Sequence, residues 1–364
     1  MNEVYVVSAV RTAIGTFGGS LKDIPPADLA SRVTAEAVRR ASVAPADVGH
    51  VVFGQVVQTE PRDMYISRVA AVDAGIPVET PALTVNRLCG SGLQAIVSAA
   101  QSLKLGDCDV AVAGGVESMS RAPFQAPSFR WGTKMGSAPI VDVLDNALRD
   151  PFHRVLMGVT AENVAERHGI TRDDQDALAL ETHRRASTAS KAGYFKEQIL
   201  GIEVKSRKGT AVFDADEHVR HDATAEDFKS LRPVFKRDGG SVTAGNASGI
   251  NDGAAAVVLA SEAAVSRLGL KPDGAAARLR ARGRRAALYG SRPHSGDPIG
   301  RQEGGARCRR HGRHRIERGI RRASLRGVAR TRFRCGESQS ERQRDFARPP
   351  GRRHWRHQYG QGGL

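Results

Sequence analysis

The sequence predicts an α/β fold in which helices are layered against a sheet, and three observations support this prediction. Short runs of β-branched and small apolar residues alternate with stretches of helical periodicity through the first 118 residues. After a long polar stretch, residues 253–259 form a second apolar run with the length of a buried strand. The regular pattern then stops near residue 279.

The expected elements of the first part follow one another along the chain. In order they are a strand at 4–9, a helix at 26–40, strands at 50–57 and 81–85, a helix at 92–105 and a strand at 110–113 closed by two glycines. The first helix is predicted because its apolar residues recur at helical spacing, and the strands because they are short, valine-rich runs. We interpret residues 1–118, together with 250–270, as one half of a layered core.

Residues 119–249 have longer polar connections, and we interpret them as an inserted subdomain. One helix is expected within them at 170–192, because Thr171 and Asp174 have the spacing of a capping box. After the strand at 253–259, a helix at 261–268 is expected to close the domain. Residues 280–364 are rich in arginine, glycine and histidine without sustained periodicity, so we expect a non-native, disordered tail.

The formal net charge of +16 is concentrated at one end of the chain. Residues 271–364 contain 26 lysines and arginines against 7 aspartates and glutamates, whereas residues 1–270 contain 29 against 32. The first three-quarters therefore has a mildly acidic balance, and its charge does not predict a nucleic-acid or membrane partner.

The N-terminus and the cysteines favour a cytoplasmic protein. No basic segment precedes an apolar run at the N-terminus, and no stretch approaches the roughly 20 apolar residues that span a bilayer. The four cysteines form no CxxC pair and no metal-ligand spacing. We expect reduced thiols, no disulfide framework and no metal site.

Cys89 is the candidate nucleophile. It precedes the helix expected at 92–105, so its sulfur should lie beside free backbone N–H groups and the positive end of a helix dipole. Both features favour a thiolate, and the flanking Gly90 and Gly92 allow an acyl group to approach the backbone closely. A thioester on this sulfur would have its carbonyl oxygen near N–H donors, as in an oxyanion hole.

The segment around Cys89 resembles the acyl-enzyme cysteine motif of the thiolase family almost residue for residue. The resemblance rests on NRLCGSGLQA at 86–95, with AGGVESMS at 113–120 downstream. Further similar segments are VRTAIGTFGG at 10–19, like the N-terminal signature, MGVTAENVA at 157–165, like the coenzyme A loop, and TAGNASG at 243–249, like the pantetheine-contacting turn. Together they extend over about three-quarters of the chain.

The resemblance implies a thiolase-like layered fold (α-β-α-β-α), of which this chain has the N-terminal half-core and the inserted coenzyme A-binding subdomain. It implies an acyl-CoA C-acyltransferase, acting in thiolysis of a 3-oxoacyl-CoA or in Claisen condensation through S-acyl-Cys89. Coenzyme A is then substrate or product, with no other cofactor, and the family is typically homotetrameric. The coenzyme A contacts that the resemblance implies are Leu148, Met157, Arg220, Ala244 and Ser248. Considered without the resemblance, Arg220 is equally well explained as a solvated surface charge, and Ser248 as a turn residue.

The family's C-terminal motifs, N-E-A-F, G-H-P and C-x-G-G-G, do not occur in this chain. They carry the histidine, asparagine and second cysteine that thiolase chemistry needs. When each codon of residues 315–328 is replaced by its last two bases and the next first base, the permitted translations include E-L-N-E-A-F. The same operation on residues 340–356 permits a segment containing G-H-P. We therefore hypothesise that the reading frame slips between about residues 279 and 289, and that the chain as given is inactive.

Two other functions remain open from the sequence. A ketoacyl-synthase-like condensing enzyme shares the nucleophile, but the context of Cys89 and the coenzyme A loop argue against it. The basic tail alone would also bind nucleic acid without specificity.

Overall fold

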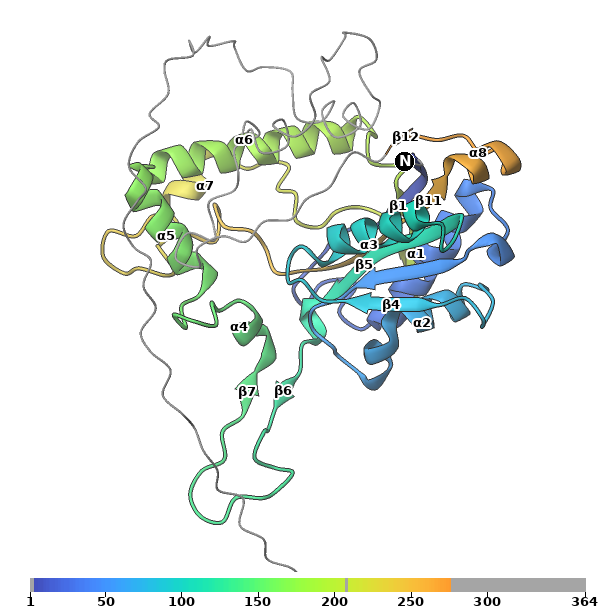
Figure 1. The fold of residues 1–364 in the computed structure, drawn as a ribbon. Coiled ribbons are helices and arrows are strands. Elements are labelled where there is room, and N and C mark those ends of the chain that lie inside the picture. The colour runs from blue at the N-terminus through green and yellow to red at the C-terminus, as the bar shows by residue number, and fades with distance from the viewer. Residues whose placement is uncertain (1–2, 207–208, 276–364) are drawn as a thin grey trace, which may run out of the picture. The chain divides into compact units, whose positions relative to one another are not determined.

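A computed structural model describes residues 3–206 and 209–275 of the 364-residue chain. The tail expected at 280–364, and the frame slip inferred from it, lie outside the described residues. The predicted α/β layered fold is confirmed for the described part, which is built around one mixed sheet (Figure 1). No helix among these residues is both long and apolar enough to cross a membrane.

The sheet is ordered β12-β1-β11-β5-β3-β4, with β2 paired to β11 and β8 to β1. Its strands are β1 (Val4–Thr12), β2 (Gly15–Thr16), β3 (His50–Gly54), β4 (Ala82–Val85), β5 (Val110–Ser118), β8 (Ile199–Leu200), β11 (Asn251–Ser261) and β12 (Gly274–Ala275). β3 is parallel to both β4 and β5, whereas β11 is antiparallel to β1 and β5. The carboxyl ends of β1, β3, β4 and β5 therefore lie along one edge of the sheet.

Helices cover both faces of the sheet (Figure 1). They are α1 (Pro26–Ala41), α2 (Ile66–Asp73), α3 (Ser91–Leu105) and α8 (Glu262–Leu268). One buried apolar cluster joins α1, α2 and α8 to the sheet, and a second joins α3 to its other face. Phe53 and Val52, which are adjacent in β3 and fully buried, point into the first and second clusters respectively, as the alternation of a strand requires.

Residues 119–249, which the sequence interpretation treats as an insertion and which we call the insertion below, contain most of the remaining elements. They are β6 (Phe124–Gln125), β7 (Val141–Asp142), α4 (Val143–Ala147), α5 (Met157–His168), α6 (Arg172–Lys191), β9 (Ile202–Ser206), β10 (Gly209–Phe213) and α7 (Ala225–Lys229). The predicted capping box is confirmed, since the hydroxyl of Thr171 accepts a hydrogen bond from the amide of Asp174 at 3.1 Å. The insertion also contributes β8 to the main sheet and places Ile202 and Phe213 in the first apolar cluster.

Several core strands differ in length from the prediction. β1 and β11 run over Val4–Thr12 and Asn251–Ser261, beyond the expected 4–9 and 253–259. β5 continues through Gly114 and Gly115, the pair expected to close it, and ends three residues later at Ser118, because it stays paired with β11 over this length. β3 ends at Gly54, because the amides of the two valines that follow Gln55 bind the Glu117 carboxylate of β5 and not a strand partner. A carboxylate at the end of β5 thus replaces the last ladder hydrogen bonds of β3.

The first turn of α3 lies directly against the ends of β3 and β5, and glycines make this contact possible. A Cβ atom at Gly54 would lie 2.5 Å from the carbonyl carbon of Ser91, and one at Gly115 would lie 3.2 Å from the Cα of Gly92. Side chains at these positions would push α3 away from the sheet. The glycines therefore fix the height of the α3 N-terminus above the sheet.

We predict that Gly54→Ala lowers the free energy of unfolding by about 2–3 kcal/mol. The added methyl group would clash with the backbone of Ser91, which cannot move aside as a flexible side chain could. Urea denaturation followed by circular dichroism measures the change. Gly92→Ala is the matched control: its Cβ would meet nothing closer than 4.0 Å, so its stability should stay within about 1 kcal/mol of wild type. Equal losses in both variants would contradict the close-contact explanation.

Candidate functional site

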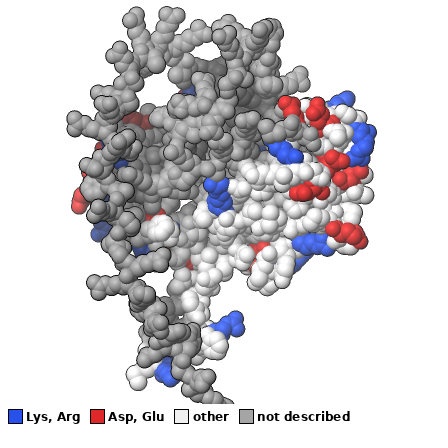
Figure 2. Space-filling view, in the orientation of Figure 1, with Lys and Arg blue, Asp and Glu red and all other residues white. Residues whose placement is uncertain are grey.

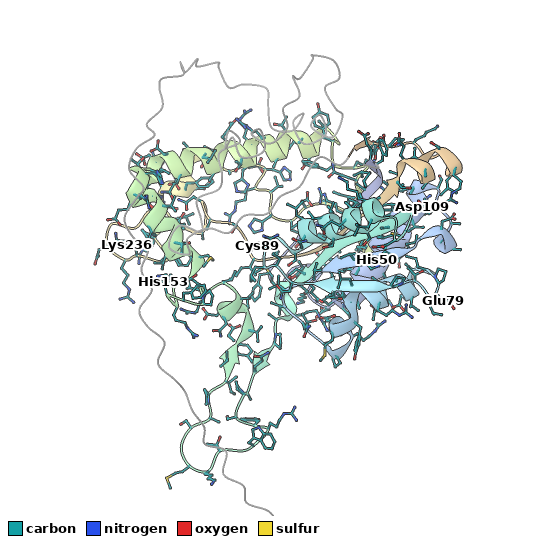
Figure 3. The ribbon with its side chains drawn as sticks, viewed as in Figure 1. His50, Glu79, Cys89, Asp109, His153 and Lys236 are labelled. Carbon is teal, nitrogen blue, oxygen red and sulfur yellow. The ribbon has the colours of Figure 1, made fainter. Side chains whose placement is uncertain are left out.

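A cavity of about 440 Å³ lies at the edge of the sheet where the parallel strands end. Ligands of open α/β sheets bind at this edge, outside the carboxyl ends of the strands. The cavity wall is mostly apolar, and the ionisable groups in it are Arg11, Cys89, Glu117 and Asp252. Figure 3 shows Cys89 at this end of the molecule, with His50 and Asp109 toward the opposite end of the strands.

Cys89 lies in a tight turn between β4 and α3, as the sequence predicted. Its side chain is exposed and lines the cavity. Ser91 holds the turn closed: its hydroxyl accepts a hydrogen bond from the amide of Arg87 at 2.8 Å and donates one to the carbonyl of Leu88 at 2.6 Å. The amide of Ser91 donates to the same carbonyl at 2.9 Å.

Leu88 has a φ of 48°, in the left-handed region that a bulky residue rarely adopts. This conformation costs roughly 1–2 kcal/mol, so the surrounding hydrogen bonds must over-determine it. Asn86 supplies one of them, since its side-chain oxygen accepts from the amide of Leu88 at 3.0 Å. The consequence is a sharp reversal that places the next residue, Cys89, at the mouth of the cavity.

The start of α3 can stabilise negative charge beside this sulfur. α3 begins at Ser91 and is preceded by Gly90 in the N-cap position, so Cys89 lies one residue outside the helix. The first amides of a helix have no intrahelical acceptor, and the helix dipole adds a partial positive charge there. The arrangement suits a covalent intermediate whose oxygen develops negative charge.

Glu117 is a second ionisable group in the cavity wall. Its carboxylate accepts hydrogen bonds from the amides of Val56 at 2.9 Å and Val57 at 3.0 Å. Burial raises the pKa of Glu117, and these two amides oppose that rise without cancelling it. The residue both closes the end of β3 and brings an acid into a mostly apolar pocket.

Asp252, at the start of β11, is buried and fixes the opposite wall. Its carboxylate accepts from the amide of Ser120 at 2.9 Å and from the hydroxyl of Ser120 at 2.6 Å. The same hydroxyl accepts from the amide of Gly18 at 2.9 Å. Asp252 therefore connects, through Ser120, the segment after β5 with the loop after β2.

Two consecutive acids of the insertion attach it to the end of β1. Asp216 forms a two-pronged ion pair with Arg11, at 2.7 and 2.9 Å, and accepts from the amide of Ile14 at 2.8 Å. Glu217 accepts from the amide of Thr16 at 2.8 Å and from the hydroxyl of Ser20 at 2.5 Å. Since Arg11 and Ile14 both line the cavity, this attachment shapes its wall.

The structure brings only part of the predicted coenzyme A set to the cavity. Leu148 lines it with Cys89, whereas Met157, Arg220, Ala244 and Ser248 do not. Met157 is nevertheless the direct neighbour of Leu148, because its amide donates to the Leu148 carbonyl at 2.9 Å.

Ala244 and Ser248 are exposed on one turn that two buried acids hold. Glu162 of α5 accepts from the amides of Ser241 and Val242, at 2.9 and 2.8 Å, just before the turn. Asn246, inside the turn, donates to Asp176 of α6 at 2.8 Å. The turn is thus fixed to the helix that begins at Met157.

Arg220 is exposed and lies over α6. Its amide donates to Nδ1 of His183 at 3.2 Å, and burial together with the charges of Arg220 and His218 lowers the pKa of His183. The guanidinium forms no ion pair with any described residue, so it is available to a ligand or to solvent.

The sequence interpretation missed the functional geometry of Asn86, Glu117 and Asp252. A recognisable signal was present, because Glu117 and Asp252 are single acids at the ends of otherwise apolar, glycine- and alanine-rich strands. In residues 3–206 and 209–275, no group of three or more histidines, cysteines and acids is arranged to hold a metal ion.

Comparisons with known proteins agree with this geometry. Residues 4–263 match the family described as "Thiolase, N-terminal domain". The chain is 66% identical over 270 residues to the beta-ketothiolase BktB of Cupriavidus necator, a match that covers 74% of this chain and 68% of that protein. It is 44% identical over 270 residues to the human mitochondrial 3-ketoacyl-CoA thiolase, with the same coverage of each chain.

Solved structures show the same similarity. The fold superposes on the crystal structure of the Bacillus anthracis acetyl-CoA acetyltransferase with a TM-score of 0.73 and 45% identity, covering 76% of this chain and 69% of that one. It superposes on human mitochondrial 3-ketoacyl-CoA thiolase in complex with CoA with a TM-score of 0.72 and 43% identity, covering 75% and 68%.

We predict that Asp216→Asn lowers the free energy of unfolding at neutral pH by about 1–2 kcal/mol, through loss of its charged hydrogen bonds. Burial alone would raise the pKa of Asp216, but Arg11 and the Ile14 amide lower it below 3.8. The stabilisation is therefore full above that value and is lost as the pH falls through the lower folded-state pKa.

Urea midpoints of wild type and Asp216→Asn should thus converge in acid. Asp214→Asn is the matched control, because Asp214 is exposed and has no hydrogen bond to a described residue. A difference between wild type and Asp216→Asn that does not shrink with falling pH would contradict the ion-pair account.

Proposed function

Because this chain belongs to the thiolase family of acyltransferases, we propose that its cavity is the acyl-accepting part of an acyl-CoA C-acyltransferase site. The observation that carries the proposal is the position of Cys89, in a strained turn before a helix and at the mouth of an apolar cavity. In this proposal Cys89 is the nucleophile of thiolysis of a 3-oxoacyl-CoA, or of the reverse condensation of two acyl-CoA molecules.

The proposed first step is transfer of an acyl group to the sulfur. The Cys89 thiolate attacks the carbonyl carbon of the acyl donor, a new C–S bond forms, and the bond from that carbon to its leaving group breaks. In thiolysis the leaving group is the enolate of acetyl-CoA, which takes a proton; coenzyme A then accepts the acyl group. Start-of-helix amides would stabilise the oxyanion in each step.

For coenzyme A we propose a path that leaves the cavity at Leu148. Met157 is hydrogen-bonded to Leu148 and begins the helix that anchors the turn of Ala244 and Ser248. We propose that this turn meets the pantetheine arm and that the exposed guanidinium of Arg220 meets the nucleotide end. One of the similar solved structures is a complex with CoA, which supports this direction.

The described part lacks groups that the chemistry requires. Among the described residues, the cavity wall contains no histidine and no second cysteine, which are the residues that the family's chemistry uses as bases. We propose that these come from the family's second half-core, read out of frame in this chain. Metal and redox cofactors have no role in the proposed steps.

The outer face of α3 supports a missing layer. Lys104 is the one charged residue of α3, and the apolar side chains of Leu93 and Leu105 are exposed on it. Figure 2 shows the surface over this region as largely uncharged, with acidic and basic side chains gathered toward one edge. Exposed leucines within a largely uncharged surface indicate a face that another part of the protein covers. We also propose the family's homotetramer for the intact protein.

We predict that native protein treated with limiting iodoacetamide at neutral pH is alkylated at Cys89 at least about tenfold faster than at Cys108. Cys108 is half-buried, and burial with its flanking aspartates raises the pKa of this thiol to about 11. Peptide mass spectrometry identifies the modified cysteine. Cys89→Ser is the control and should abolish the fast reaction; equal rates at the two cysteines would contradict the proposed nucleophile.

We predict that shifting the reading frame back between residues 279 and 289 raises thiolysis activity by about 10³-fold or more, since removing members of a catalytic unit commonly costs that much. The assay is loss of a 3-oxoacyl-CoA in the presence of coenzyme A. Cys89→Ser in the repaired protein is the control. A gene that does not encode N-E-A-F and G-H-P in the second frame would overturn the hypothesis.

A further inference from the structure

Both backbone polar groups of Leu88, its amide and its carbonyl, are hydrogen-bonded. Its carbonyl accepts two hydrogen bonds from Ser91, while its amide donates to the side chain of Asn86. These bonds define the left-handed conformation that turns the chain at Cys89. Ser91 lies inside the glycine-lined contact of α3 with the sheet, so its position is fixed independently.

Asn86 is fixed in turn by the loop after β3. Its side-chain amide donates to the carbonyl of Val56 at 3.3 Å. The amide of Val56 donates to the carboxylate of Glu117, which also binds the amide of Val57. A series of hydrogen bonds therefore connects Glu117, the partly buried acid of β5, through the backbone of Val56 and the side chain of Asn86, to Leu88. Leu88 is the strained residue just before the nucleophile.

We propose that Asn86 and Glu117 are positioning residues that hold the Cys89 turn in its left-handed form. The inference rests on the proposed role of Cys89 and adds to it the device that orients the sulfur. Neither residue needs to touch the acyl group. Their effect is to keep the sulfur at the cavity, just before the start of α3.

The test uses the full chain, with iodoacetamide as the probe, and measures the rate of Cys89 alkylation from about pH 6 to pH 10. For each variant, the alkylation rate at pH 7 is divided by the plateau rate of the same variant at high pH. Asn86→Ala should lower this ratio about fivefold. Asn86→Ser should recover most of this loss, because a serine hydroxyl can accept from the amide two residues on. Glu117→Gln should lower the rate at pH 7, relative to the plateau rate of the same variant, about twofold.

A double-mutant cycle separates positioning from general loosening. Glycine adopts positive φ without strain, so Leu88→Gly should reduce the effect of a further Asn86→Ala to less than about twofold. Gln101→Ala changes an exposed position of α3 and should leave the pH profile of Cys89 alkylation unchanged. Cys108 reports unfolding, because loosening of the fold would raise its alkylation rate.

The positioning role is overturned if Asn86→Ala leaves the Cys89 profile unchanged, if Cys108 accelerates in parallel, or if Leu88→Gly gives no coupling. Failure of the proposed nucleophile has a different signature. In that case Cys89 of the wild-type chain would react no faster than Cys108, whatever the variants do.

Discussion

The site depends on one close contact, in which the first turn of α3 lies directly on the ends of β3 and β5. Gly54 and Gly115 remove the side chains that would separate helix from sheet. This contact sets where Ser91 lies, and Ser91 closes the turn that exposes Cys89. A nucleophile placed in this way costs backbone strain at Leu88, which hydrogen bonds from both sides offset.

Carboxylates organise the rest of the cavity. Glu117 binds backbone amides after β3, Asp252 joins two loops, and Asp216 attaches the insertion to β1. Each accepts hydrogen bonds from backbone amides at the edge of the sheet that would otherwise have no partner. The apolar lining and the helix start supply the chemistry, while these acids fix the geometry.

Much of this was predictable from the sequence. Valine-rich runs and helical periodicity gave the order of the core elements, and the capping box at Thr171 was recognised from two residues. The resemblance around Cys89 pointed to the family that the comparisons identify. The lengths of β3 and β5 were wrong, because β3 ends where Glu117 binds a loop 60 residues away in sequence, and β5 continues as long as it pairs with β11. Local pattern does not contain contacts at that separation.

In the proposed reaction, the sulfur at position 89 accepts an acyl group from an acyl-CoA. The most direct measurement is mass spectrometry of the Cys89 peptide after frame-repaired protein is mixed with acetyl-CoA and quenched in acid. We expect one acetyl group on this peptide, removed again when free coenzyme A is added before quenching. An unmodified Cys89 peptide, or an acetyl group that coenzyme A does not remove, would contradict it.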